Sequence, residues 1–387
     1  MIPGTFLFSS LGRSGRWTYP TEQQFDQYRF LARPYWTTQH YDRNNMNTQS
    51  LRVRRSPTRL PGNRSHGFTL VELLVVLAII TTIAGMLIVM LNGAREESRR
   101  LRTVSQIRRI NQVLTDKWED VGASPIRVNI PPATPLAASR ALRVNAMRQL
   151  QRLEFPDRIA DLAINPSAAL GAPPSSWINY RLRVQATYGT SDWTDIVQNL
   201  WSENFEGAEC LYLVLSATFD DEGSALRYFN SDEIGDVDGD LMPEILDQWG
   251  NPIEFIRWAP GYRSPIHEQD ATISPDPFDP FKVDPRFTTP GQYFDPSDGQ
   301  TKPLVPFNLF PLVYSAGPDE EYGVALWNEP EHSDGGVRKV EYANLILPND
   351  PYPVDDADGY LVGATGDFDG DGITGHEDNI DNHWDIR

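Results

Sequence analysis

The chain has 387 residues, and its 34 Lys and Arg against 53 Asp and Glu give a formal net charge of −19. Apolar residues make up 40% of it and aromatic residues 11%, too many for a disordered protein, and the single cysteine, Cys210, excludes a disulfide scaffold and a cysteine-rich zinc module. Residues 1–150 carry 21 basic and 9 acidic side chains, whereas residues 151–387 carry 13 and 44. An acidic body repels nucleic acid, so we expect no nucleic-acid partner.

A long apolar run is the first element that the sequence predicts. Leu73–Leu91 contains no charged residue, and two threonines are its only polar members. As a helix it is roughly 29 Å long, close to the ~30 Å hydrocarbon core of a bilayer. The alternatives are a buried core helix, which seldom lacks a polar face for so long, and a cleaved secretory signal, whose apolar region is only about 7–15 residues. We therefore expect one transmembrane helix over residues 70–91.

The flanking charges predict the orientation of this helix. No acidic residue lies between Met46 and Gly67, and five arginines do: Arg52, Arg54, Arg55, Arg59 and Arg64. Because basic flanks stay in the cytoplasm, we expect a single-pass inner-membrane protein with its N-terminus inside and its acidic body periplasmic or extracellular. Arginines at 95, 99, 100 and 102 weaken the asymmetry, and Glu96 and Glu97 partly offset them.

A hexapeptide, Gly67-Phe-Thr-Leu-Val-Glu72, stands directly before the apolar run. An ionisable side chain at the edge of a membrane helix is costly unless paired, so Glu72 is a functional candidate. The hexapeptide with its basic leader resembles the signal shared by type IV pilins and the pseudopilins of type II secretion. The resemblance implies that a prepilin peptidase cuts after Gly67 and methylates the Phe68 amine. It also implies that Glu72 pairs with the N-terminal amine of a neighbouring pilin-like subunit, and that the subunit can be extracted into a filament.

The leader that this cleavage implies, residues 1–67, is unusually long for such a signal. Met46 offers an alternative start with a leader of 22 residues. Residues 1–45 show no periodic pattern, so we expect the leader to be disordered and removed.

The helical pattern continues beyond the membrane. No proline lies between Pro61 and Pro125, and apolar side chains recur at steps of three and four. They are Leu101, Val104, Ile107, Ile110, Leu114 and Trp118. We expect one helix over residues 68–120, some 80 Å long, with its second half packed against a soluble domain. This arrangement resembles the pilin fold.

The rest of the chain predicts an α+β body on a small antiparallel sheet. Residues 121–217 are expected to form a helical insertion, with helices over 136–154 and, in two pieces, 191–217, where Cys210 is a core residue. Residues 218–350 contain three strand-like runs: Ile253–Trp258, Leu309–Ser315 and Gly323–Trp327. Twelve prolines between 251 and 311 predict a long surface loop over 262–308. Residues 351–387 form an acidic C-terminal segment.

A second resemblance covers part of this body. Asp247 precedes Trp249-Gly-Asn-Pro252 and a strand, and Tyr314-Ser-Ala-Gly-Pro-Asp319 follows later. This order resembles the C-terminal half of the major pseudopilin of type II secretion, where a Ser-x-Gly-x-Asp segment opens a calcium-holding loop. The resemblance implies a calcium site in the turn over residues 319–336, with Asp319, Glu320, Glu321, Glu331 and Asp334 as its candidate acidic residues.

Two acidic segments match the oxygen pattern of an EF-type calcium loop, with donors at positions 1, 3, 5, 7 and 12 and glycine at 6. The first match has all of them: Asp367, Asp369, Asp371, Gly372, Ile373 and Asp378. The second has Asp236, Asp238, Asp240 and Asp247, but Leu241 stands where the loop needs glycine. A solvated acidic surface is the alternative for both. Because three carboxylates this close repel one another without a cation, we expect calcium as the cofactor.

No sequence motif of a catalytic site is present: the chain has no H-E-x-x-H, no G-x-S-x-G and no P-loop. The sequence therefore predicts a structural subunit of a pseudopilus or type IV pilus-like filament rather than an enzyme. The alternative is a membrane-tethered, calcium-dependent binding or adhesion module that does not assemble. Cleavage after Gly67 and multimerisation distinguish the two.

Overall fold

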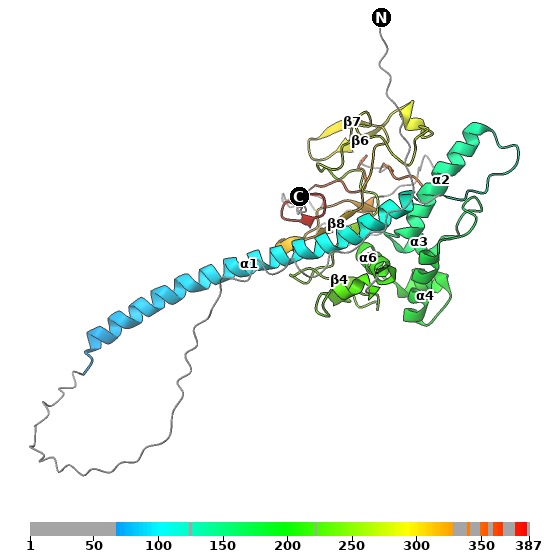
Figure 1. Ribbon diagram of the computed structural model, residues 1–387. Coiled ribbons are helices and arrows are strands. Elements are labelled where there is room, and N and C mark those ends of the chain that lie inside the picture. The colour runs from blue at the N-terminus through cyan, green and yellow to red at the C-terminus, as the bar shows by residue number, and fades with distance from the viewer. Residues whose placement is uncertain are drawn as a thin grey trace, which may run out of the picture. The chain divides into compact units, whose positions relative to one another are not determined.

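The computed structural model describes residues 67–123, 126–220, 223–327, 339–340, 349–354, 359–366 and 376–384. Thr69–Arg387 forms one compact unit, to which every element below belongs (Figure 1). The predicted leader, apart from Gly67, lies outside the described residues.

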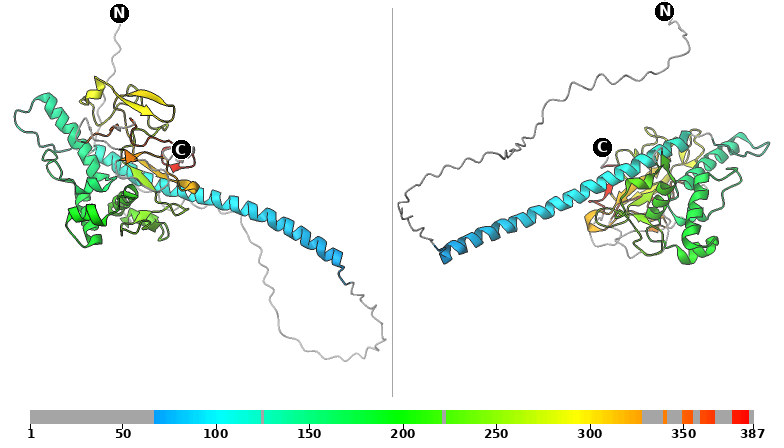
Figure 2. Two further views of the ribbon diagram at one scale, coloured as in Figure 1. Left: turned by 180° about the vertical axis from the view of Figure 1, so that it is seen from behind. Right: turned by 60° about the horizontal axis from the view of Figure 1, so that its bottom comes forward.

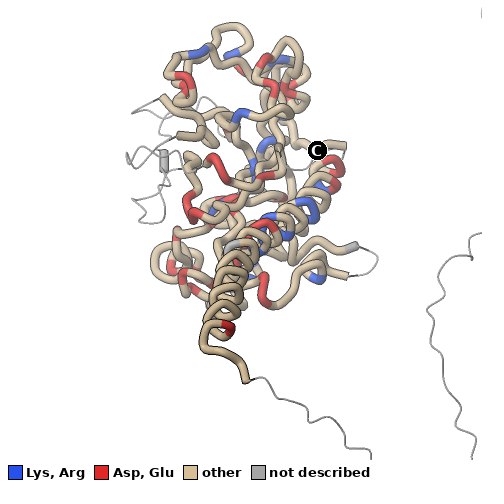
Figure 3. The backbone as a smooth tube through the Cα atoms, turned by 90° about the vertical axis from the view of Figure 1, so that its left-hand side faces the viewer, with Lys and Arg blue, Asp and Glu red and all other residues tan. Residues whose placement is uncertain are grey.

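Helix α1 (Leu70–Ala123) runs without interruption for 54 residues, as the sequence predicts. Its first part exposes a continuous set of large apolar side chains, and among the described helices it alone is long and apolar enough to cross a membrane. Figure 2 shows this part of α1 extending away from the rest of the unit. In Figure 3 the same turns are almost free of charged residues, whereas the later turns carry both signs.

The second part of α1 packs into the body. Val104, Ile107, Ile110, Leu114 and Trp118 are buried, which confirms five members of the predicted stripe. The sixth, Leu101, is 57% exposed, so its prediction is wrong. The helix becomes buried only at Thr103, one turn or less further on, because the body begins to cover α1 there.

The predicted helical insertion contains several short helices around a buried one. They are α2 (Leu136–Glu154), α3 (Ile159–Ala163), α4 (Ser175–Tyr188), α5 (Trp193–Asp195), the π-helical turn η1 (Ile196–Leu200) and α6 (Glu206–Ala217). Almost every side chain of α6 is buried, Cys210 included, and α6 packs against α4, β4 and β5. A Cβ on Gly207 would stand 2.7 Å from the Phe255 carbonyl oxygen, so the glycine permits this close approach.

The central sheet has three antiparallel strands in the order β11 (Ile380–Asp381), β8 (Leu312–Ser315), β5 (Glu254–Ile256). β5 and β8 lie within two of the predicted strand runs. Helix α1 lies against β8 and β11, and α6 against β5, so the sheet is covered by helices from both the N-terminal part and the insertion. The α+β class and the helix-on-sheet packing are as predicted.

Four further strand pairs surround this sheet. Three are antiparallel: β1 (Phe219–Asp220) with β2 (Gly223–Ser224), β3 (Ile234–Gly235) with β4 (Glu244–Ile245), and β6 (Gly291–Asp295) with β7 (Gln300–Leu304). The third predicted strand run yields β9 (Leu326–Trp327), which pairs in parallel with β10 (Lys339–Val340) and does not join the central sheet. The 3-10 turns are η2 (Ala225–Tyr228), η3 (Pro285–Phe287) and η4 (Gly317–Asp319).

The proline-rich segment 262–308 is not a simple surface loop. It contains the β6–β7 hairpin and several buried charged residues. Arg286 donates to Asp284 and Asp350, and Arg148 of α2 reaches Asp276 and Asp284. Prolines interrupt the backbone hydrogen bonding between strands, but they do not prevent burial. In this segment backbone pairing is sparse, and side-chain ion pairs hold it against α2.

Candidate functional site

The predicted processing site lies at the exposed start of α1. Gly67 and Phe68 precede the helix, and the Phe68 side chain is 85% exposed. Among the described residues, a Cβ on Gly67 would meet no atom within 4 Å, and Gly67 is not among the glycines with a positive φ. Within the described part of the chain, neither packing nor a left-handed backbone therefore requires glycine at position 67.

Glu72 has a local role that the sequence interpretation missed. The backbone N–H and the hydroxyl of Thr69 both donate to Glu72 Oε2, at 2.7 and 2.9 Å, and the Glu72 N–H donates to Thr69 Oγ1 at 3.2 Å. These bonds form a capping box that satisfies free N–H groups at the start of α1. The signal was available in the sequence, because Thr69-x-x-Glu72 is the capping-box pattern.

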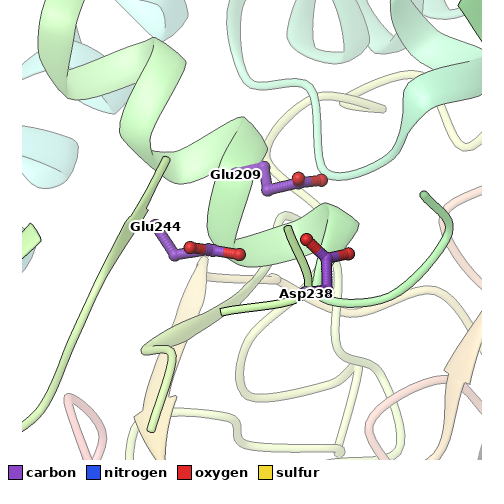
Figure 4. A group of neighbouring side chains, drawn as sticks. All are labelled: Glu209, Asp238 and Glu244. Atoms are coloured by element: carbon purple, nitrogen blue, oxygen red, sulfur yellow. The ribbon is translucent and has the colours of Figure 1, made fainter. Parts of the chain in front are cut away.

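A second group of acidic side chains converges beside α6. Glu209 comes from α6, Asp236, Asp238 and Asp240 from the loop between β3 and β4, and Glu244 from the start of β4. One carboxylate oxygen from each of Glu209, Asp238 and Glu244 lies within 4.8 Å of the other two, and the same holds for Asp236, Asp238 and Asp240. Figure 4 shows Glu209, Asp238 and Glu244 pointing toward one another from their separate elements. We call these five residues the carboxylate cluster.

Backbone hydrogen bonds shape the loop of the carboxylate cluster. Asp236 accepts from Gly239 N–H at 2.8 Å and Leu241 N–H at 3.1 Å, and Asp240 accepts from Ser202 N–H and Met242 N–H, both at 2.7 Å. Leu241 has a φ of 83°, the left-handed conformation in which its side chain is strained and glycine is favoured. The left-handed turn thus falls at the residue that stands where the loop pattern has glycine.

The inner side of the carboxylate cluster is buried and lacks positive charge. Glu209 and Glu244 are fully buried, and within the described residues no Lys or Arg forms an ion pair with any of the five. Burial, and to a lesser extent the charges of Asp238 and Asp236, raise the pKa of Glu244 to about 8. Burial and nearby acidic groups raise the pKa of Glu209 well above its usual range. Without a cation, this arrangement disfavours full ionisation.

Asp247 does not belong to the carboxylate cluster, which corrects its predicted place at the twelfth position of the loop. Its Oδ1 accepts from the N–H groups of Trp249, Gly250 and Asn251 at 2.8–2.9 Å, and its Oδ2 accepts from Ser315 Oγ at 2.6 Å. These bonds hold the turn between β4 and β5. Glu244 and Glu209 face Asp238 instead, and no linear loop pattern could have indicated Glu209, which lies 27 residues before Asp236.

The C-terminal calcium loop is only partly described. Asp367, Asp369, Asp371 and Ile373 lie outside the described residues, as do Glu331 and Asp334 of the third candidate turn. Asp378 lies beside Asp319, and partial burial together with the neighbouring Asp319 raises the pKa of Asp378 to about 6. The pairing of β11 with β8 sets Ile380 opposite Ser315. Asp378, the last ligand position of the predicted C-terminal loop, therefore lies beside Asp319, the first residue of the predicted turn over residues 319–336.

Comparison with known proteins gives one match. The family described as prokaryotic N-terminal methylation motif matches residues 62–88, which include Gly67, Phe68, Glu72 and much of the apolar part of α1. The chain carries a type IV pilin-like signal. Neither a curated protein nor a solved structure matches the chain.

Two features of the structure agree with the pilin-like signal. The long apolar helix that follows it fits a single-pass membrane protein, and the small antiparallel sheets behind that helix are consistent with a pilin-like fold. Signals of this kind stand at the start of pilin-like and pseudopilin precursors, which suggests a structural rather than a catalytic role.

Proposed function

We propose that this protein is a structural subunit of a type II secretion pseudopilus or a type IV pilus-like filament. In this proposal a prepilin peptidase cleaves it after Gly67, its N-terminus faces the cytoplasm, and its acidic body lies in the periplasm or outside the cell. The observation that carries the proposal is the methylation motif over residues 62–88, continuous with the exposed apolar part of α1.

The surroundings of Gly67 support processing by an external enzyme. The described residues around Gly67 impose no need for glycine, which agrees with recognition of a small residue by a peptidase active site. The exposed Phe68 and the start of α1 at Leu70 leave the Gly67–Phe68 bond outside the helix, where an enzyme can bind it in extended form.

The test is the intact mass of protein purified from membranes. The expected wild-type product begins at Phe68, with a further mass for an N-methyl group, and Gly67→Leu should leave an unprocessed chain. Gly93→Leu is the matched control, because Gly93 also has no neighbour within 4 Å of a Cβ and lies in α1 beyond the motif. The proposal would be contradicted if Gly67→Leu were processed as Gly93→Leu is, or if neither the wild type nor the two variants were processed.

Contacts within the body support the pseudopilin-like C-terminal half. The two segments that carry this resemblance are joined in space: Asp247 accepts from Ser315 Oγ, and Asn251 Nδ2 donates to the Gly317 carbonyl at 3.0 Å. We propose that calcium binds the C-terminal loop, with Asp367, Asp369, Asp371, Ile373 and Asp378 as ligands. The position of Asp378 beside Asp319 supports a cation there, because two adjacent carboxylates repel one another.

A further inference from the structure

We propose that the carboxylate cluster is a calcium site that joins the helical insertion to the β3–β4 loop, with Glu209, Asp238 and Glu244 as its central ligands. The proposal goes beyond the filament function and concerns a site separate from the C-terminal loop. Its ligands come from two parts of the chain, one in α6 and the others between β3 and β4.

The spacing of the oxygens fits the ion. Calcium binds oxygen at about 2.3–2.6 Å, so two ligand oxygens on opposite sides of it lie roughly 4.6–5.2 Å apart. One oxygen from each of Glu209, Asp238 and Glu244 lies within 4.8 Å of the other two, and Asp238 also belongs to the group with Asp236 and Asp240. All these donors are carboxylates, the ligands of hard cations, and no histidine or cysteine belongs to either group.

Independently of this spacing, two carboxylate oxygens of the cluster are buried without an N–H or O–H donor among the described residues. Glu209 is completely buried, its Oε2 accepts from the Trp201 indole, and no N–H group of the described residues donates to its Oε1, although the Asp240 side chain also reaches Glu209. Asp238 Oδ2 is likewise buried without a partner. A buried carboxylate oxygen without a donor is costly, and an ion between Glu209 and Asp238 would satisfy both oxygens.

The loop around the cluster is already folded for such an ion. Asp236 and Asp240 accept backbone N–H groups of the loop, which positions the chain on both sides of Asp238. Val237 N–H donates to Glu244 at 3.1 Å and holds that side chain beside the loop. The strained turn at Leu241 completes the loop. We infer that the ion fixes the distance between α6 and β4, which pack directly on each other.

The experiment compares two glutamates of one helix in the full-length protein in detergent. Glu209→Gln removes a charge from the cluster, whereas Glu206→Gln alters an equally buried side chain whose Oε2 accepts from Ile159 N–H at 2.9 Å. Calorimetric titration with calcium should show one equivalent fewer, or an affinity at least tenfold weaker for that equivalent, in Glu209→Gln alone. Equal stoichiometry and affinity in both variants would overturn the proposal.

Terbium gives a readout tied to this site. The Trp201 indole contacts Glu209, so Tb³⁺ bound in the cluster should be excited through this ring. Trp201→Phe and Glu209→Gln should each remove the same part of the sensitised emission, and Glu206→Gln should keep it. Thermal unfolding without calcium checks folding: Glu209→Gln should then be no less stable than the wild type, because glutamine has nearly the same shape and brings no charge into the buried cluster. If Glu209 instead serves only as a protonated hydrogen-bonding group, calcium will stabilise Glu209→Gln as much as the wild type, and the proposal fails.

Discussion

At the scale of single residues, Glu72 combines two roles. Within one chain it closes the capping box with Thr69, and in the proposed filament its charge pairs with a neighbour's amine. The capping box needs an acceptor, which glutamine also supplies, whereas the ion pair needs a negative charge. The two roles can therefore be separated by substitution.

Glu72→Gln should keep the helix start and the thermal stability of the body but lose incorporation into filaments. Glu72→Ala should lose incorporation and also the two hydrogen bonds that the carboxylate accepts from Thr69, which loosens the start of the helix. Thr69→Val is the control, because it weakens the cap and leaves the charge. Filament pull-down and thermal unfolding measure the two properties, and normal incorporation of Glu72→Gln would remove the proposed ion pair.

Two buried histidines make a second residue-scale feature. His267 Nδ1 lies 3.3 Å from the Tyr262 carbonyl oxygen, and Phe310 N–H donates to its Nε2 at 2.8 Å. His383 packs edge-on against His267 at 4.4 Å between ring centroids. His267 Nε2 also lies 3.1 Å from the Phe310 carbonyl oxygen, and burial away from water disfavours a charged ring. Burial lowers the pKa of His267 to about 4, and burial and His267 lower the pKa of His383 well below its usual value.

Because these folded-state pKa values lie below the unfolded value of about 6.5, the unfolded chain binds more protons between pH 6.5 and 4. The stability that the neutral rings contribute is complete above about pH 6.5 and declines as pH falls, by up to about 1.4 kcal/mol per pH unit for each histidine. His267→Gln should unfold with a shallower dependence on pH than the wild type over this range. Parallel curves for the two proteins would contradict the assignment.

At the scale of elements, the C-terminal segment is tied to the sheet at one end. β11 pairs with β8, and Asn379 Nδ2 donates to the Tyr322 carbonyl at 2.7 Å, just after Asp378. A cation in the preceding loop would therefore connect the acidic segment to the central sheet.

For this loop we expect that Asp371→Ala loses one calcium equivalent and that protease then removes the last twenty or so residues faster. Without the ion, repulsion among Asp367, Asp369 and Asp371 opens the loop, whereas a hundredfold excess of calcium over Kd stabilises it by about 2.7 kcal/mol. Asp116→Ala, an exposed change on α1, is the control. Unchanged stoichiometry in Asp371→Ala would mean that the stretch is a solvated acidic surface.

At the scale of the whole molecule, α1 serves two environments. The described side chains of its apolar first part are exposed, and its second part supplies a central row of the hydrophobic core. Between the two, Glu96 accepts from the Trp249 indole at 2.9 Å, and Thr103 Oγ1 accepts from Gln248 N–H at 3.2 Å.

A chain that begins at Glu96 should therefore be soluble and unfold at nearly the same temperature as the full-length protein. A chain that begins at Gln112 lacks Val104, Ile107 and Ile110, each buried, and should lose several kcal/mol, since burying one such side chain contributes about 1.5–3 kcal/mol. Thermal unfolding of the two truncated proteins measures this. Equal stability would show that α1 is only an anchor.

The sequence by itself determined the elements that depend on local pattern. The apolar run, the Gly67–Glu72 hexapeptide, the continuous α1, helix α2 and the cores of β5 and β8 were all predictable, because composition and periodicity act over neighbouring residues. The capping box of Thr69 and Glu72 was equally local and was overlooked.

Only the tertiary structure decided the rest. It brought Glu209 from α6 to Glu244, turned Asp247 toward Ser315, and buried Arg286 in a segment whose prolines predict exposure. In each case the side chain meets a partner that lies far away in the sequence. The neighbouring residues of a carboxylate or guanidinium do not show whether water, a buried partner or an ion will satisfy it. Which partner satisfies the group depends on which elements pack together. For Glu209, the close approach of α6 to β4 and β5 decides it.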